Sequence, residues 1–423
     1  MSKDKKRLVP VRRFKEFENS AAWEQRKLGE ILSDLYNGQT PSRNVKSYWK
    51  GDIPWLTSGE LNHGIVEETI EKISESGKKA ANLRLIPSGT IVIAITGLEA
   101  PGTRGNCAIL GIDTTVNQSV MALVVKNNID TQFVFQWYKK IGEEYGIRYT
   151  QGTKQQSYNY DLVKILPITI PTTTEEQQKI GSFFNQLDSL IALHQRKLDK
   201  LKRVKSAYLT ELFPAEGERE PKRRFPGFTG AWEQRKIIDL LNQPITDGPH
   251  ETPNLVEKGI PFISADAIVD NRIDFSRKRG FITKEYDLQC RKKYSPELYD
   301  VYLVKSGSTV GKVAIVETTK QFNVWSPLAA MRCKGKTNPY FLYFLFQTKE
   351  NQNQVKSKAS NGTQPNLSMR EIEQFNVQIP SLHDEQKKIG DFFKQLDSLI
   401  ALHQRKLDKL KKMKAAYLNE MFV

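Results

Sequence analysis

The sequence predicts a mixed α/β protein with two globular domains, each followed by one long helix. Three observations lead to this prediction. The chain has 423 residues, which is more than one ordinary hydrophobic core accommodates. It contains a tandem repeat, and each repeat ends in a long stretch with helical apolar periodicity. A hydrophobic fraction of 39%, with 10% aromatic residues, is enough to fill such cores.

The repeat covers the whole chain. The sequence QLDSLIALHQRKLDKLK at 186–202 recurs unchanged at 395–411, and AWEQRK at 22–27 recurs at 231–236. Both blocks are displaced by 209 residues, so one duplication explains them together. The residues between the blocks differ strongly, which indicates one variable unit and one nearly invariant unit in each half.

The invariant unit is predicted to be a helix over 175–213, without proline and with Gly181 as its only glycine. Its 39 residues would extend roughly 58 Å. Apolar residues recur at steps of three and four and form a heptad seam. A helix with one apolar seam needs a partner, so we expect the two copies to pack on each other. The seam positions are Ile180, Phe184, Leu187, Ile191, Leu198, Leu201, Tyr208 and Leu212, and in the second copy Ile389, Phe393, Leu396, Ile400, Leu407, Leu410, Tyr417 and Met421.

Two polar residues interrupt the seam, His194 and Lys205, and the second copy repeats them as His403 and Lys414. One interpretation is that they lie at the edge of the seam and extend to water. The other is that they fix the register or orientation of the helices at a cost in stability. The sequence leaves both open.

The variable units are predicted to be mixed α/β domains with short strands. Short landmarks persist in them, IPWL at 53–56 and IPFI at 260–263. An Asn cap followed by Pro predicts a helix from Asn338 to Phe346, with Asp130–Lys140 as its counterpart. The expected strands are Thr90–Thr96 and Met121–Lys126, matched in the second half by Val301–Lys305 and Lys312–Glu317.

The charge favours an anionic partner. The 64 Lys and Arg residues against 48 Asp and Glu give a net charge of +16, which suits nucleic acid or an acidic membrane surface. No apolar run approaches the roughly 18 residues of a spanning helix, and the amino-terminal segment is charged. The three cysteines are isolated, as in a protein of the reducing cytoplasm without a disulfide framework or zinc site. We expect a soluble, cytoplasmic, basic protein.

Candidate catalytic motifs are incomplete. GSTVGK at Gly307–Lys312 resembles a phosphate-binding loop, but three residues separate its glycines and Val313 follows the lysine. Asn338–Phe341 (NPYF) lacks the second proline of the motif with which adenine methyltransferases hold a base. A turn and a helix cap explain these residues. No histidine has metal-ligand spacing, and no nucleophile motif is present. The sequence therefore predicts a binding protein with no catalytic residue and no metal site.

Two variable α/β domains, each followed by a near-identical long helix, resemble the specificity subunit of type I restriction-modification enzymes. Two openings, AAWEQRKLG at 21–29 and PGFTGAWEQRK at 226–236, look like that family's domain openings. LPITIPTTTEEQ at 166–177 and FNVQIPSLHDEQ at 375–386 look like its closing segments. The resemblance extends over essentially the whole chain.

The resemblance implies two target-recognition domains separated by an antiparallel coiled coil of the two helices, with pseudo-two-fold symmetry. Each domain would read one half of a bipartite, asymmetric double-stranded DNA sequence. One departure, Asn19-Ser20-Ala21 in place of Phe228-Thr229-Gly230, leaves the path of the first segment open. The implied parts are a first recognition domain (1–165), a first spacer helix (166–213), a linker (214–230), a second recognition domain (231–374) and a second spacer helix (375–423).

The resemblance also implies partners. Two copies of a methyltransferase subunit would dock on the helices, and restriction-translocase subunits would complete the enzyme. S-adenosylmethionine, ATP and Mg²⁺ would belong to those subunits, and this chain would hold no cofactor. Two alternatives are a coiled-coil scaffold without specific DNA binding and a DNA-modifying enzyme that acts alone.

The residues that read DNA are expected in polar loops, because Lys and Arg bind phosphates and polar side chains bind base edges. Glycine-containing loops are favoured because glycine lets the backbone approach DNA closely. Ordinary solvated turns remain the alternative at each position. The loops are Asn37–Arg43, Thr150–Gln156, Asp247–His250, Lys278-Arg279 and Ser360–Gln364. The candidates in them are Asn37, Gln39, Thr40, Ser42, Arg43, Gln151, Thr153, Lys154, Gln155, His250, Lys278, Arg279, Thr363 and Gln364.

Overall fold

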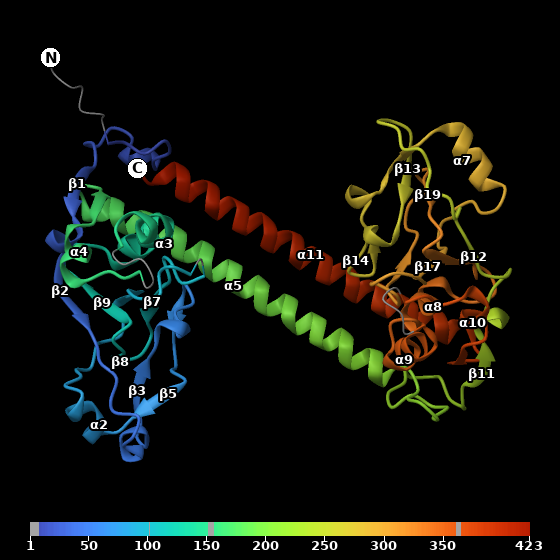
Figure 1. Ribbon diagram of the computed structural model, residues 1–423, viewed down its shortest axis with the longest axis horizontal. Coiled ribbons are helices and arrows are strands. Elements are labelled where there is room, and N and C mark those ends of the chain that lie inside the picture. The colour runs from blue at the N-terminus through green and yellow to red at the C-terminus, as the bar shows by residue number, and fades with distance from the viewer. Residues whose placement is uncertain (1–7, 101, 151–155, 361–364) are drawn as a thin grey trace. The chain divides into compact units, whose positions relative to one another are not determined.

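The chain divides into two compact units in a computed structural model that describes residues 8–100, 102–150, 156–360 and 365–423 (Figure 1). Unit 1 contains residues 1–195 and 405–423, and unit 2 contains residues 196–404. Each unit has one globular α/β domain and parts of two long helices. We call residues 8–173 the first domain and residues 219–382 the second domain.

The first domain has a five-stranded sheet of order β2-β9-β6-β7-β4, a three-stranded sheet of order β5-β3-β8, and the pair β1-β10. Its strands are β1 (Glu24–Lys27), β2 (Leu32–Asn37), β3 (Ile53–Leu56), β4 (Ile65–Val66), β5 (Glu71–Ile73), β6 (Ile91–Ala94), β7 (Cys107–Leu110), β8 (Thr115–Val116), β9 (Val120–Val125) and β10 (Pro167–Ile170). Its α-helices are α1 (Leu28–Ile31), α2 (Glu75–Ala80), α3 (Thr131–Arg148) and α4 (Tyr160–Ile165), with 3₁₀ helices at Lys15–Phe17, Lys46–Trp49 and Ser58–Glu60.

The second domain has a four-stranded sheet of order β12-β20-β17-β18, a three-stranded sheet of order β16-β13-β19, and the pairs β11-β21 and β14-β15. Its strands are β11 (Glu233–Lys236), β12 (Thr246–Asp247), β13 (Ile260–Ile263), β14 (Ile268–Val269), β15 (Arg272–Ile273), β16 (Gly280–Ile282), β17 (Val301–Val304), β18 (Val313–Ile315), β19 (Asn323–Val324), β20 (Leu328–Met331) and β21 (Asn376–Ile379). Its α-helices are α6 (Ile237–Leu240), α7 (Lys284–Arg291), α8 (Pro339–Leu345), α9 (Lys349–Lys358) and α10 (Met369–Glu373), with 3₁₀ helices at Ala265–Ala267 and Phe275–Arg277.

The two domains share one scaffold. The order β12-β20-β17-β18 repeats β2-β9-β6-β7, and β16-β13-β19 repeats β5-β3-β8. This corrects one predicted correspondence. Lys312–Glu317 contains β18, which answers β7, whereas the counterpart of Met121–Lys126 is β20. All these strands are short and apolar, so their composition alone does not distinguish sheet neighbours.

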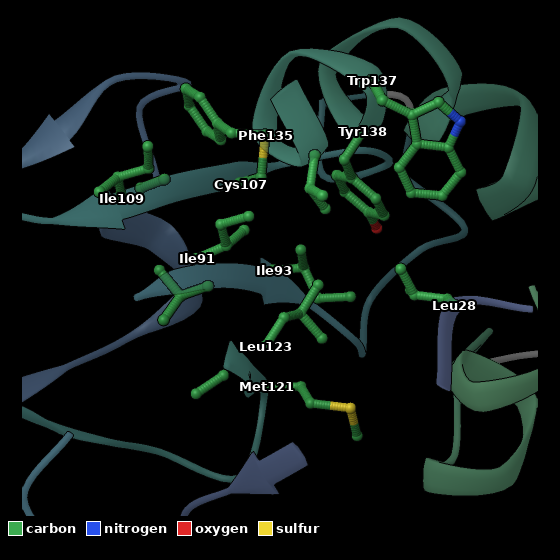
Figure 2. Packing of buried hydrophobic residues seen from close by; sticks show 14 of the residues in the cluster. Leu28, Ile91, Ile93, Cys107, Ile109, Met121, Leu123, Phe135, Trp137 and Tyr138 are labelled. Atoms are coloured by element: carbon green, nitrogen blue, oxygen red, sulfur yellow. The ribbon is translucent and has the colours of Figure 1, made fainter. Parts of the chain in front are cut away.

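The core of the first domain lies between helix α3 and the five-stranded sheet. Tyr138 of α3 faces Ile93 and Cys107 on the neighbouring strands, with Phe135 and Trp137 to either side of it (Figure 2). All five side chains are buried. The sheet strands β6 and β7 are buried along their whole length, as expected of strands covered on both faces.

The predicted helix cap and turn in the second domain are confirmed. The side chain of Asn338 accepts a hydrogen bond from the backbone N–H of Phe341 (3.0 Å) at the start of α8. Asp130 caps α3 in the same way, and α3 extends to Arg148, beyond the predicted end at Lys140. The GSTVGK segment is the turn between β17 and β18.

The two predicted long helices are confirmed as α5 (Thr174–Glu211) and α11 (His383–Met421). The predicted segments 166–213 and 375–423 begin too early, because each first contains a strand, β10 or β21. The sequences LPITIP and FNVQIP explain this correction. Apolar residues alternate with other residues in them, as in a β-strand, and the strands that they form, β10 and β21, pair with β1 and β11. Pro171 and Pro380 then disfavour helix at the residue before them.

In unit 1 the helix parts run antiparallel. The rings of Phe183 and Tyr417 are 5.2 Å apart, and Asp188 of α5 pairs with Lys414 of α11 at 2.5 Å. The residue number rises along α5 as it falls along α11. Lys414 is only 8% exposed, so the interpretation that it extends to water is wrong. Burial holds its pKa down, at about 8.

Unit 2 repeats this arrangement. The rings of Tyr208 and Phe392 are 5.0 Å apart, and Lys205 of α5 pairs with Asp397 of α11 at 2.7 Å. Lys205 also donates to the amide oxygen of Gln347 (3.0 Å), so it does not extend to water either. Both lysines, Lys205 and Lys414, therefore form ion pairs between the helices at fixed positions. This agrees with the interpretation that they fix the register of the two helices. The predicted seam is buried at Leu187, Leu198, Leu396 and Leu407 and half-buried at Ile191, Leu201, Ile400 and Leu410.

The segments that enter the two domains are equivalent, which resolves the path of the first one. Arg13 forms two hydrogen bonds with the buried carboxylate of Glu176 at 2.7 and 2.6 Å. Arg224 binds the buried carboxylate of Glu385 in the same way, at 2.7 Å for both bonds. The different residues at Asn19-Ser20-Ala21 therefore do not change how the first segment is anchored.

Candidate nucleic-acid interface

Two of the predicted loops occupy equivalent places at the ends of β2 and β12. A Cβ atom on Gly38 would lie 1.6 Å from the carbonyl oxygen of Val116, and one on Gly248 would lie 1.8 Å from that of Val324. Only glycine fits at either position. Contact inside the protein therefore requires these glycines, a reason other than the close approach to DNA expected from the sequence.

In the first domain, two indoles anchor the loop Asn37–Arg43. The ring N–H of Trp55 donates to the carbonyl oxygen of Gln39 (3.1 Å), and that of Trp49 donates to the carbonyl oxygen of Ser42 (3.2 Å). Both donors bind the loop backbone, so these two contacts use none of the loop side chains. Asn37, Gln39, Ser42 and Arg43 are exposed, and Thr40 is half-exposed with its hydroxyl bonded to Gln118.

Arg43 is already engaged within the protein. Its guanidinium makes two hydrogen bonds to the carboxylate of Glu71, at 2.5 and 2.8 Å. It also lies over the ring of Trp49, with 3.6 Å between the guanidinium carbon and the ring centroid. The hydrogen bonds that Arg43 donates to Glu71 raise the pKa of Arg43. To contact DNA with its full set of donors, Arg43 must first leave Glu71.

In the second domain, the loop Asp247–His250 surrounds a buried carboxylate. Asp247 is fully buried and pairs with Lys293, with Lys305 at 3.3 Å and with the ring of His250 at 3.1 Å. The side chain of His250 is 69% exposed. One anion thus holds three groups that carry or can carry positive charge at the end of the sheet, and only His250 and Lys293 extend far toward solvent.

Lys278 and Arg279 lie beside this loop. Arg279 is exposed, and its guanidinium carbon is 4.0 Å from the centroid of the Trp325 ring. Trp325 follows β19 and contacts the loop, because a Cβ on Gly248 would lie 3.0 Å from the Trp325 Cα. Lys278 is half-buried over the ring of Phe281. The structure therefore brings Arg279 and His250 to the same part of the domain.

The other candidates, Gln151, Thr153, Lys154, Gln155, Thr363 and Gln364, lie outside the described residues. Residues next to them are placed. The carbonyl oxygen of Gln156 accepts from the N–H of Leu98 (3.1 Å), and that of Pro365 accepts from the N–H of Gly307 (3.0 Å). These contacts follow the ends of β6 and β17. Register puts those ends one strand away from Asn37 and Asp247, across β9 and β20.

Several residues at this sheet end were not predicted from the sequence. They share a contact with the predicted loops: Trp49, Trp55, Trp325, Lys293 and Lys305. One signal could have found the equivalence of the loops, since Asn37-Gly38 and Asp247-Gly248 are separated by 210 residues, close to the repeat offset. The aromatic and lysine partners have no such signal, because only the tertiary fold brings them to the loops.

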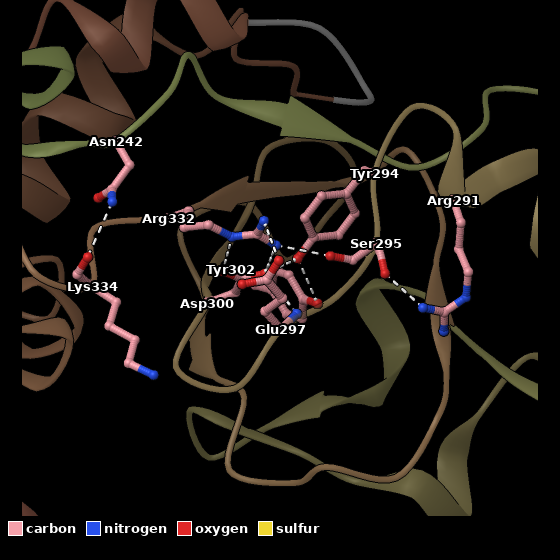
Figure 3. A network of polar contacts seen from close by, with 9 residues as sticks. All are labelled: Asn242, Arg291, Tyr294, Ser295, Glu297, Asp300, Tyr302, Arg332 and Lys334. Carbon is pink, nitrogen blue, oxygen red and sulfur yellow. Dashed lines mark hydrogen bonds and ion pairs between the residues drawn. The ribbon is translucent and has the colours of Figure 1, made fainter.

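A largely buried polar network joins β17 and β20 at the other end of this sheet (Figure 3). Arg332 binds both oxygens of Asp300, at 2.9 and 2.8 Å, and Tyr294 donates to Asp300 at 2.6 Å. Tyr302 of β17 lies 3.0 Å from the Tyr294 hydroxyl. Burial raises the pKa of both tyrosines far above the usual value, so their hydroxyls stay protonated. Satisfied networks of this kind favour one arrangement of the strands that they connect.

Two kinds of feature are absent from the described residues. No group of three or more His, Cys, Asp or Glu side chains is arranged to hold a metal ion within that part of the chain. Of the helices placed there, none combines the length and the apolar character needed to cross a membrane.

Comparison with known families accounts for both repeats. The model of the type I restriction modification DNA specificity domain matches this sequence twice, at residues 21–203 and 230–412. Together these ranges contain most of the chain. The chain belongs to this family. Each match of the specificity domain extends from a domain opening into one of the long helices.

Relatives described as type I restriction enzyme specificity subunits match over most or part of this chain. The type I restriction enzyme MjaIX specificity subunit of Methanocaldococcus jannaschii is 25% identical over 422 residues, 94% of this chain and 92% of the relative. The EcoR124I/EcoR124II specificity subunit of Escherichia coli is 26% identical over 175 residues, 41% of this chain and 42% of the relative. The crystal structure of the type I restriction-modification S subunit from M. genitalium has a TM-score of 0.67 at 15% identity, with 98% and 99% of the two chains covered. The last likeness shows a shared fold.

Proposed function

We propose that this chain gives a type I restriction-modification enzyme its DNA specificity. It recognises a bipartite, asymmetric sequence in double-stranded DNA and directs methyltransferase and restriction subunits to that sequence. The observation that carries the proposal is the presence of two domains with one scaffold and different side chains at the same sheet end. A protein that recognises two different half-sites needs one shared scaffold to bind DNA in the same way twice and different side chains to bind different bases.

The different chemistry of the two loops supports an asymmetric target. The first domain presents Asn37, Gln39 and Ser42, which are neutral and suited to base edges. The second presents His250 and Arg279, which carry or can carry positive charge. A net charge of +16 supplies the attraction to phosphates that both domains require.

The proposal gives this chain no reaction of its own. Methyl transfer and DNA cleavage, with S-adenosylmethionine, ATP and Mg²⁺, belong to the partner subunits. The incomplete GSTVGK and NPYF segments agree with this division, since each has a structural use as a turn or a cap. A protein that directs DNA methylation shares a compartment with the chromosome, so we place it in the cytoplasm.

Two copies of the methyltransferase subunit are proposed to dock on the long helices. Leu190 on α5 is 44% exposed and Leu193 is 38% exposed; the repeated residues Leu399 and Leu402 on α11 have the same exposures. Seam packing explains identity at buried positions, but it does not explain identical exposed leucines. Two equal apolar patches on otherwise diverged halves fit two copies of one partner.

The docking proposal is tested by counting partner copies. Leu190→Asp and Leu399→Asp should each reduce the complex from two methyltransferase subunits to one, and the double variant should bind none. Leu288→Asp, which changes a leucine of α7 that is 64% exposed, is the matched control and should keep both copies. Native mass spectrometry of the purified complex gives the stoichiometry. Two copies on the double variant would contradict the docking sites.

The specificity proposal is tested by the adenine methylation pattern of a host genome. The chain is co-expressed with its methyltransferase subunit, and the genome is sequenced with detection of modified bases. We expect a two-part asymmetric motif that appears only when the chain is present. No methylation by a complex that is shown to assemble would contradict the proposal and favour a scaffold without sequence-specific DNA binding.

A further inference from the structure

Arg279 has a guanidinium that is oriented but not paired. It stacks on Trp325 at 4.0 Å from the ring centroid, and its backbone N–H donates to the carbonyl oxygen of Phe262 (2.9 Å). Within the part of the chain that the structure describes, no carboxylate lies within ion-pair distance of this guanidinium. The side chain is exposed. Stacking therefore fixes a planar set of N–H donors without using them.

Backbone hydrogen bonds hold the residue under Arg279, Trp325, in place. The backbone N–H of Trp325 donates to the carbonyl oxygen of Ile263 (2.9 Å), and its carbonyl oxygen accepts from Leu328 (3.1 Å). The next residue, Ser326, donates to the carbonyl oxygen of Pro249 (3.2 Å) in the loop with His250. The buried indole N–H of Trp325 has no acceptor among the described residues. Since an unpaired buried N–H costs free energy, hydrogen bonding does not explain why the ring is held there.

We propose that Arg279, supported by Trp325, reads a guanine in the half-site bound by the second domain. Guanine presents two acceptors, O6 and N7, in the major groove, and an arginine fork can donate to both. Adenine presents one acceptor and one donor there, so it cannot accept both bonds. This inference rests on the proposed function, because it requires sequence-specific DNA binding.

Reading a base suits this arginine better than holding a phosphate. A phosphate contact tolerates many orientations, and flexible lysines such as Lys278 supply it. A base contact requires one orientation, and a stacked guanidinium loses less freedom when it binds. The stacking of Arg279 on an indole therefore favours a ligand, such as a base, that requires one orientation of the guanidinium.

The first domain has no equivalent of this pair among its described residues. Asn117 takes the place of Trp325, since its backbone N–H donates to Leu56 as that of Trp325 donates to Ile263, both at 2.9 Å. Arg43 and Arg84 of the first domain stack on Trp49 and Tyr36, and they have donors on Glu71 and Asp34. The inferred guanine contact thus belongs to one half-site only.

The test uses the full chain in complex with its methyltransferase subunits and a pool of randomised DNA duplexes. Bound duplexes are sequenced for the wild type, for Arg279→Gln and for the control Arg277→Gln. The control removes the same charge two residues away, from an exposed arginine that pairs with Asp274 at 3.8 Å. We expect the wild type to select guanine at one position of one half-site. Arg279→Gln should lose that preference by about 10- to 100-fold, with the other half-site unchanged.

The possible outcomes separate this inference from the function on which it rests. A bipartite target that Arg279→Gln leaves intact, or whose second-domain half contains no guanine, overturns the inference alone. Equal weakening of all duplexes by Arg279→Gln also overturns it, because a phosphate contact would act in that way. A wild-type complex that enriches no sequence overturns both. The thermal unfolding midpoint of Arg279→Gln, matched to that of Arg277→Gln, shows that an altered target does not come from misfolding.

Discussion

The loops Asn37–Arg43 and Asp247–His250 occupy the same place in two domains and differ in almost every side chain. Each begins at a strand end where a glycine passes against a carbonyl oxygen, Gly38 at Val116 and Gly248 at Val324. Beyond the glycine, the first loop exposes neutral polar groups and an arginine that is paired with Glu71, whereas the second surrounds a buried carboxylate with cations. The residues that build the scaffold are therefore distinct from the residues that form the surface. Backbone contacts require the same scaffold residues in both domains, whereas the exposed loop side chains can differ.

The long helices show the opposite behaviour, because their buried residues and their exposed residues are both repeated over 186–202 and 395–411. The ion pairs Asp188–Lys414 and Lys205–Asp397 are copies of each other at the repeat offset. Yet their surroundings differ, since the domains supply different neighbours. In unit 1, Lys139 of α3 also binds Asp188, at 3.1 Å. In unit 2, the amide of Gln347 assists Lys205 instead.

The largest expected effect on the free energy of unfolding comes from removing the carboxylate of Asp188, which lies between the two helices in unit 1. Asp188→Asn leaves two lysines, Lys139 and Lys414, without their anion, whereas Asp397→Asn leaves one. Breaking a buried ion pair from one side costs about 3–5 kcal/mol, and we expect Asp188→Asn to lie at the upper end of this range and Asp397→Asn at the lower end. Urea unfolding of the full chain gives the two free energies of unfolding.

The control for this comparison is Asp391→Asn, which removes an exposed carboxylate that pairs with Lys387 at 2.6 Å on α11. It should cost less than about 1 kcal/mol. If Asp188→Asn were no more damaging than this control, the buried pair would not hold the helices in register.

The next largest effect tests the shared scaffold. Gly38→Ala and Gly248→Ala each force a methyl group against a backbone carbonyl that cannot rotate away. We expect both to lower the free energy of unfolding by about 2–3 kcal/mol, and by equal amounts within error. Gly59→Ala is the control, because its Cβ would meet nothing nearer than 3.9 Å. Unequal losses would mean that the two sheet ends are not equivalent in packing.

The parts that sequence predicts well are those with a period or a repeat. The helix expected over 175–213 is found at Thr174–Glu211, because heptad spacing and the absence of proline define a long helix locally. The turn at Gly307–Lys312 and the cap at Asn338 follow from one or two residues each. The composition of the two glycine loops predicts a DNA-binding role, and the structure places the loops at equivalent sheet ends.

The parts that sequence misses depend on contacts between distant residues. One example is the pairing of Asp247 in β12 with Lys293, which follows α7, and with Lys305, which follows β17. These residues come together only when the domain is folded. Lys205 and Lys414 were open to two interpretations because a helical pattern shows a polar residue in a seam but not the carboxylate opposite. The predicted match of Met121–Lys126 with Lys312–Glu317 is wrong for a similar reason, since short apolar strands carry no mark of their neighbours.

A smaller effect follows from the pKa of Lys414, which burial and the positive charge of Lys139 lower to about 8 in the folded chain. Between that pH and the higher pKa of an unfolded lysine, the unfolded chain binds more protons, so stability rises with pH. The difference between the wild type and Lys414→Met should therefore move in favour of the wild type above pH 8, by up to about 1.4 kcal/mol per pH unit. Urea unfolding at pH 7 and pH 9 measures it. A difference that does not change with pH would mean that Lys414 titrates as an ordinary lysine.

The smallest effect concerns the arginine of the first domain. Glu71→Gln removes the carboxylate that holds Arg43, so the guanidinium becomes available to a phosphate near the loop Asn37–Arg43. An exposed ion pair is worth about 0.2–1 kcal/mol, so the affinity of the complex for DNA should rise by about 2- to 5-fold. The slope of log affinity against log salt should steepen by about one. Glu75→Gln removes an equal charge from a carboxylate that is 72% exposed and pairs with Lys78. If Glu75→Gln steepened the slope as much as Glu71→Gln does, the gain would come from net charge alone, and Arg43 would not lie at the DNA surface.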